Sequence, residues 1–101
     1  MKECCRQYLM EQFGDESVVE EIYNEYVSSL GQKIAECDKA LDARDWDTLD
    51  KAAHAMKGNS LAAGDAATAN ETIELRHAAK LQDWDTASAL VARIREFSSQ
   101  L

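Results

Sequence analysis

The sequence contains no proline and only four glycines among its 101 residues. Tight turns between strands commonly use these two residues, so their scarcity argues against a β-rich fold. The chain is instead rich in alanine, leucine, glutamate, aspartate and lysine, several of which are strong helix formers. We therefore predict an all-α protein.

Positive charge is also scarce. Eleven lysines and arginines face nineteen aspartates and glutamates, which gives a formal net charge of -8. A nucleic-acid backbone would be repelled by such a surface, because it requires clustered basic side chains. The composition argues against nucleic acid as a partner and favours partners with basic or metal-bearing surfaces.

Cysteines and long apolar runs are few. The three cysteines, Cys4, Cys5 and Cys37, are odd in number and lack the spaced pair of a thiolate metal site, so we expect reduced thiols and no bound metal. No apolar run approaches the roughly 20 residues of a membrane span, and residues 1–10 lack the apolar core of a signal peptide. We expect a cytoplasmic protein without a membrane segment.

The chain is long enough for one hydrophobic core, so we predict a single domain over residues 1–101. Apolar residues three and four apart predict a long helix over residues 16–43, with Gly31 as the place for a kink. The same spacing predicts four further helices, at about residues 5–13, 47–63, 66–80 and 84–99. On the first of these, one short apolar face consists of Cys5, Tyr8, Leu9 and Phe13. Four substantial helices with short corners are typical of an antiparallel four-helix bundle, and the short N-terminal helix is expected to cover it.

Two corners of the chain have nearly the same sequence. Asp-Trp-Asp-Thr occurs at residues 45–48 and again at residues 83–86. Aspartate or threonine at these points can accept hydrogen bonds from the free amides of the following helix. Two copies do not make a tetratricopeptide-like array, which needs at least three repeats of about 34 residues.

A glycine interrupts the helix predicted over residues 47–63. Glycine inside a helix costs about 0.5–1 kcal/mol relative to alanine. The three-and-four spacing of the residues expected to face inward nevertheless continues across Gly58, so we place the helix end at Gly64 and the next N-cap at Asp65. The six inward-facing residues are Leu49, Ala52, Ala53, Met56, Ser60 and Ala63. At about 100° per residue, His54, Lys57 and Gly58 share the face that points away from the core.

These three residues suit phosphoryl transfer. A neutral imidazole can attack phosphorus, Lys57 can balance the negative charge that develops, and Gly58 leaves space for the phosphoryl group. An ordinary surface histidine is the alternative that the spacing alone leaves open. His77 has no such neighbours, and we interpret it as a surface residue.

The segment HAMKGNSLAAG, residues 54–64, matches the H-x-x-K-G-x-x-x-x-x-G signature of histidine-containing phosphotransfer (HPt) domains, which the chain resembles over roughly residues 16–95. The resemblance implies that His54 is phosphorylated, that Lys57 is its charge partner, and that Gly58 provides clearance. It also implies that Gly64 shapes the following turn.

Three positions depart from the family pattern. Met56 stands where the family usually has leucine, a mild change in the core. Asp65 and Arg76 stand where the family often has a small residue and a glutamate. These departures bear on local packing and on the choice of partner.

The resemblance implies a phosphorelay intermediate that carries a phosphoryl group between receiver domains. The chain has no G-x-x-x-x-G-K loop, so we predict a phosphocarrier without its own nucleotide site or cofactor, and expect Mg²⁺ on the partner receiver. We expect a monomer that meets response-regulator receiver domains, a hybrid histidine kinase, or both. Two alternatives are a non-phosphorylated adaptor that uses the same face and a self-assembling helical domain.

Leu61 shares the His54 face two turns further on and is apolar. An exposed apolar residue beside a site can mark a partner surface. We predict Leu61, Lys51 and Asp50 as partner contacts.

Overall fold

The computed structural model describes residues 1–101 and contains five helices and no strand, which confirms the all-α prediction. No helix combines the length and the apolar character that crossing a membrane requires. The long helix continues through Gly31, and the third helix continues through Gly58. The helices are α1 (Glu3–Phe13), α2 (Glu16–Ala43), α3 (Trp46–Ala62), α4 (Ala66–Leu81) and α5 (Trp84–Ser99).

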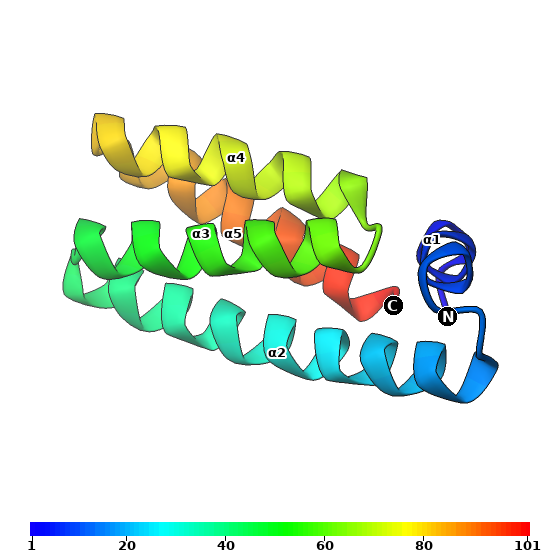
Figure 1. Cartoon of the computed structure of the whole chain (residues 1–101). Helices are drawn as coiled ribbons and strands as arrows, with labels where there is room; N and C mark the ends of the chain where they lie inside the picture. The colour runs from blue at the N-terminus through cyan, green and yellow to red at the C-terminus, as the bar shows by residue number, and fades with distance from the viewer.

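Helices α2 to α5 form the predicted four-helix bundle (Figure 1). α2 packs against α3 and α5, and α4 packs against the same two helices, so the four close around one core. Consecutive helices run in opposite directions, and α1 lies across the end of the bundle where α2 begins (Figure 1). The predicted architecture, including the short N-terminal helix, is confirmed.

An aspartate is the N-cap residue of each helix of the bundle. The carboxylates of Asp15, Asp45, Asp65 and Asp83 each accept hydrogen bonds from backbone amides in the first turn of the helix that follows. These bonds satisfy amides that have no partner within the helix. The helix starts are therefore fixed locally by the sequence.

The two repeated corners meet at one end of the bundle. The rings of Trp46 and Trp84 stack with 3.3 Å between their centroids and 20° between their planes. The guanidinium of Arg44 lies 4.7 Å from the centroid of the Trp84 ring. The repeat in sequence thus joins the α2–α3 corner to the α4–α5 corner.

The predicted core residues are largely buried. All six residues expected to face inward from the third helix are buried, from Leu49 to Ala63. The apolar face of the N-terminal helix is only partly buried, because Tyr8 and Phe13 are 38% and 51% exposed. Their helix crosses the end of the bundle and packs against α2 alone among the helices, so it buries only Cys5 and Leu9.

A buried carboxylate connects the N-terminus to the bundle. Asp65 is 0% exposed, and it accepts hydrogen bonds from Lys2 Nζ at 2.8 Å, from Tyr26 Oη at 2.7 Å and from Thr68 Oγ1 at 2.7 Å. Burial disfavours the charged form, but these hydrogen bonds outweigh it and hold the pKa of Asp65 below its ordinary value. The residue that departs from the family pattern is therefore a structural anchor.

Gly64 lies in the turn just before this anchor. Its φ of +75° is in the left-handed region, and a β-carbon there would lie 2.5 Å from Cβ of Tyr8. Both observations require glycine, because other residues disfavour this conformation and would collide with α1. The turn after α3 and the position of α1 are thus coupled.

Candidate functional site

His54 lies on the exposed face of α3. Lys51, His54, Gly58 and Leu61 are all exposed, and they follow one another at spacings of three, four and three residues. We call these four residues the α3 ridge. Its apolar member, Leu61, is 50% exposed. As predicted, the imidazole of His54 points away from the core and is accessible to a second molecule.

Arg76 reaches the imidazole from α4. Its Nη1 lies 3.0 Å from Nδ1 of His54, and its Nε donates a hydrogen bond to Oδ1 of Asp50, also at 3.0 Å. Asp50 lies one turn before His54 on α3, so the carboxylate and the imidazole hold one guanidinium between them. The side chains of Arg76 and Asp50 are only 26% and 34% exposed.

The role of Arg76 at the site was missed by the sequence analysis, which recorded Arg76 only as a departure from the family pattern. Asp50 was predicted as a partner contact, and in this structure its carboxylate is engaged within the protein. Lys51, the neighbouring predicted contact, pairs instead with Asp47 on the exposed surface at 2.9 Å. The sequence pattern that could have predicted this contact is a basic residue on α4 together with a histidine and an aspartate one turn apart on α3.

Next to the Arg76 contact is a hollow of about 130 Å³ between α3 and α4. Four of its five lining residues carry basic side chains, and we call it the basic recess. Lys57, the predicted charge partner, is among them and takes part in no salt bridge. The lining residues are Lys57, Ile73, Arg76, His77 and Lys80.

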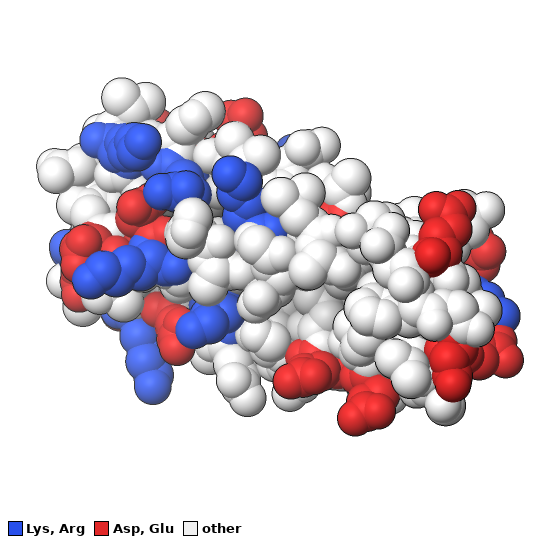
Figure 2. All heavy atoms as spheres, in the orientation of Figure 1, with Lys and Arg blue, Asp and Glu red and all other residues white.

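The charge of the molecule is unevenly distributed. Figure 2 shows most of the lysine and arginine of this face gathered over its left half, which carries α3, α4 and the end of α2, with some acidic side chains among them, whereas aspartate and glutamate predominate toward the end near α1. An overall charge of -8 thus coexists with a basic region beside His54. Such a region attracts anionic groups over short distances despite the negative total.

The surface at Gly58 is open. A β-carbon built at this glycine would meet no atom within 4 Å, and the same is true of Gly31 in α2. The fold therefore does not require glycine at either position. Space at Gly58 matters only to a group that approaches His54 from outside.

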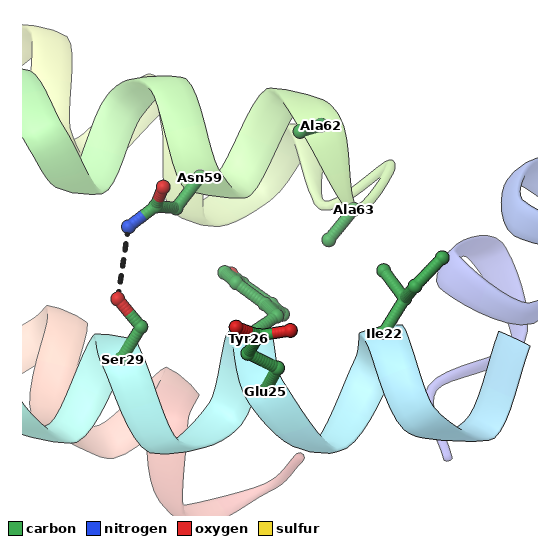
Figure 3. A pocket seen from close by; sticks show the side chains of 7 residues that line it. All are labelled: Ile22, Glu25, Tyr26, Ser29, Asn59, Ala62 and Ala63. Carbon is green, nitrogen blue, oxygen red and sulfur yellow. Dashed lines mark hydrogen bonds between the residues drawn. The ribbon is translucent and has the colours of Figure 1, made fainter. Parts of the chain in front are cut away.

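A shallow groove of about 220 Å³ runs along the other side of α3, between α2 and α3. Asn59 donates a hydrogen bond to Ser29 Oγ at 3.0 Å across it, and Tyr26 lies between the two helices (Figure 3). Ile22, Ala62 and Ala63 supply apolar surface there. The α3 ridge is thus flanked by a partly apolar groove on one side and the basic recess on the other.

One comparison with known proteins identifies the family of the chain. A family model described as the Hpt domain matches residues 21–101, which include all of α3, α4 and α5. The chain therefore belongs to the Hpt domain family. Comparison with curated proteins and with solved structures found no match. Membership assigns the chain a phosphotransfer role in two-component signalling, as a phosphocarrier module without its own nucleotide site.

Proposed function

We propose that His54 is the residue that carries the phosphoryl group, and that Nε2 is its reactive atom. One observation supports this proposal above the others. The imidazole is exposed on the α3 ridge while its Nδ1 is in contact with Arg76, so Nε2 is the nitrogen left open to a partner. His77, the second histidine, lies in the basic recess and has no neighbouring glycine.

The proposed donor is the aspartyl phosphate of a receiver domain. Nε2 forms a bond to phosphorus, the phosphorus–oxygen bond of the acyl phosphate breaks, and its electron pair stays on the aspartate oxygen. The imidazole releases its N–H proton to solvent. Lys57 balances charge on the transferring group, and Mg²⁺ held by the receiver supplies further stabilisation.

The second half of the proposed relay is the reverse step toward another receiver. A carboxylate oxygen of that receiver's aspartate attacks phosphorus, the bond between phosphorus and Nε2 breaks, and its electron pair returns to the ring, which takes up a proton from solvent to become neutral imidazole again. The chain is then a carrier between two receiver domains, because each half-reaction uses the same exposed nitrogen. Support for this order comes from the family and from the absence of a nucleotide-binding loop.

A label-transfer experiment tests the proposal. A receiver domain encoded near this protein is phosphorylated with a radioactive label and mixed with the chain. We expect the label to move to this protein and to be acid-labile and alkali-stable, as a phosphoramidate is. An unlabelled protein that nevertheless binds the receiver would favour the non-phosphorylated adaptor.

Gly58→Ala should separate stability from transfer. Alanine is the better helix former, and nothing occupies the space of the new methyl group, so we expect the free energy of unfolding to rise by up to about 1 kcal/mol. The methyl group would narrow the approach to Nε2, and we expect slower phosphoryl transfer. Urea denaturation and the rate of labelling measure the two effects.

Gly31→Ala is the matched control, because Gly31 is also an exposed glycine inside a long helix with no atom near its missing β-carbon. We expect the same gain in stability and an unchanged transfer rate. Equal transfer rates in the two variants would contradict the clearance role of Gly58.

Leu61→Glu should weaken receiver binding. A half-exposed leucine on the α3 ridge is a candidate anchor for the partner, and truncating or charging such an anchor commonly weakens binding about tenfold or more. Leu81, which is 79% exposed at the end of α4, offers the matched control in Leu81→Glu. Titration of each variant with the receiver measures the dissociation constant, and equal losses would remove Leu61 from the interface.

A further inference from the structure

The contact between Arg76 and His54 restricts where the imidazole can carry its proton. A guanidinium has five N–H donors and no acceptor, and it stays protonated in proteins. At 3.0 Å from Nη1, Nδ1 of His54 must therefore present its lone pair. A neutral imidazole carries one proton, so in this contact the proton is on Nε2.

Asp50 makes this arrangement specific. Its Oδ1 accepts a hydrogen bond from Nε of Arg76, which fixes the plane of the guanidinium and directs Nη1 toward the imidazole. The carboxylate makes no hydrogen bond to His54 itself. A glutamate at position 76 would act in the opposite way, since a carboxylate accepts hydrogen bonds and would place the proton on Nδ1.

Most of the charged side chains that contact Arg76 or line the basic recess are basic. Asp50 is the acidic group in this set, and it is paired with Arg76. Basic side chains from the next turn of α3 and from α4 complete the surroundings of the site. The members of this set, which are Arg76, its carboxylate partner and the titratable residues that line the basic recess, are Asp50, Lys57, Arg76, His77 and Lys80.

We propose that Arg76 is a positioning residue that keeps Nδ1 of His54 unprotonated, both before and after Nε2 is phosphorylated, and that it thereby lengthens the lifetime of the phosphohistidine. The second part rests on the proposed function. An imidazole with a phosphoryl group on Nε2 still has a lone pair on Nδ1, so the contact with Arg76 is retained. In the unphosphorylated ring the contact places the proton on Nε2, so the contact has to open and the proton has to move through solvent to Nδ1 before the Nε2 lone pair attacks phosphorus. That proton leaves Nδ1 for solvent once the bond to phosphorus has formed, and the contact with Arg76 then forms again.

The lifetime follows from the leaving group. In hydrolysis, a water oxygen attacks phosphorus, the bond between phosphorus and Nε2 breaks, and its electron pair returns to the ring. If Nδ1 already carries a proton, the ring departs as neutral imidazole. If it does not, the ring departs as the much poorer leaving group imidazolate. By occupying the Nδ1 lone pair, Arg76 opposes the protonation that hydrolysis needs.

The first experiment uses the unphosphorylated protein. Nitrogen-15 NMR of the full chain at about pH 8, above the ordinary pKa of histidine, distinguishes a nitrogen that carries a proton from one with a free lone pair. We expect the lone pair of His54 on Nδ1 in the wild type and in Arg76→Lys, and the proton on Nδ1 in Arg76→Glu. A proton on Nδ1 in the wild type would overturn the proposal.

The second experiment measures lifetime. The protein is labelled with phosphoramidate, a small-molecule donor, and the loss of phosphohistidine is followed by phosphorus-31 NMR. We expect the label to decay about tenfold faster in Arg76→Glu, as the loss of one hydrogen bond to a charged group predicts. Equal decay rates in Arg76→Glu and the wild type would overturn the proposal.

Arg93→Glu is the matched control. Arg93 is exposed on α5 and forms an ion pair with Glu71 at 3.0 Å. Replacing it with glutamate changes the net charge by the same amount as Arg76→Glu and leaves the contact between Arg76 and His54 intact. We expect the wild-type tautomer and the wild-type lifetime in this variant. The same shortening in Arg93→Glu would attribute the effect to net charge and overturn the role of Arg76. If neither phosphoramidate nor a receiver labels the wild type, the proposed function fails, while the tautomer experiment still decides the role of Arg76.

Discussion

Replacing His54 with glutamine is expected to abolish labelling by a phosphorylated receiver. Glutamine keeps a polar side chain of similar reach, but its amide nitrogen is not a nucleophile, so no bond to phosphorus forms. The side chain of His54 is exposed and contacts only Arg76 through a hydrogen bond, so the bundle should fold as before. Circular dichroism and thermal unfolding check the fold, and transfer of the radioactive label measures the loss.

His77→Gln is the control for this variant. His77 is also exposed, lies on the neighbouring helix and lines the basic recess. It has no glycine four residues further along its helix, whereas His54 has Gly58 there. We expect its labelling to match the wild type within a factor of about two, because an exposed substitution that leaves the nucleophile in place has a small effect. Label retained on His54→Gln, or lost from His77→Gln, would assign the phosphoryl group to another residue.

The candidate site could be predicted from sequence where one helix supplies it. His54, Lys57 and Gly58 lie within five consecutive residues, and helical geometry alone places them on one face. Arg76 comes from the next helix, and its contact with His54 depends on how α3 and α4 pack. The way in which α3 and α4 are rotated against each other is set by side chains in the core, so the residue pattern within one helix could not predict this contact.

The same distinction applies to the fold. Each bundle helix begins at an aspartate cap and shows apolar spacing, which are local signals, so the helix bounds were predicted closely. Burial on α1 was predicted less well, since Tyr8 and Phe13 fit the pattern and yet remain exposed. The stacking of Trp46 on Trp84 was also not predicted, although the two repeated corners contain these residues. Contacts between distant segments account for each of these differences.

Net charge gave only partial guidance on partners. A total of -8 argues against nucleic acid, but it conceals the basic recess beside His54 and the acidic end near α1 (Figure 2). A receiver that presents acidic groups around its aspartate would meet the basic region. The location of charge relative to the reactive nitrogen is therefore more informative than its sum.

Asp65→Ala is expected to lower the free energy of unfolding by about 3 kcal/mol, the typical cost of removing one partner from a buried charged pair. The substitution leaves the buried hydroxyl of Tyr26 without its carboxylate acceptor and Lys2 without its partner. It also removes the N-cap of α4. Urea denaturation at neutral pH measures the loss, and reduced protection of α1 from hydrogen exchange should accompany it.

Asp83→Ala provides the matched control for the cap. Asp83 accepts hydrogen bonds from the amide and hydroxyl of Thr86 at 3.2 and 2.6 Å, much as Asp65 does from Thr68 at 3.3 and 2.7 Å. It is exposed and has no contact equivalent to Lys2 or Tyr26. We expect a clearly smaller loss of stability, and equal losses would mean that Asp65 acts only as a cap.

The pH dependence of stability provides a separate test of the Asp65 charge. Burial disfavours its ionised form, but hydrogen bonds from Lys2, Tyr26 and Thr68 prevail and hold the pKa of Asp65 below its ordinary value of 3.8. A carboxyl with a lowered pKa stabilises the fold above its ordinary value, and that contribution is lost as pH falls through the lower folded value. The other capping aspartates are present in both proteins, so their effects cancel in a comparison of wild type with Asp65→Asn.

We therefore expect wild type to be more stable than Asp65→Asn at neutral pH, with a difference that shrinks once the pH falls below about 4. Urea denaturation at a series of pH values measures this difference. A gap that stays constant through this range would contradict the stabilising role of the charge. In that case the hydrogen bonds of the side chain, which asparagine partly reproduces, would have to connect α1 to the bundle without help from ionisation.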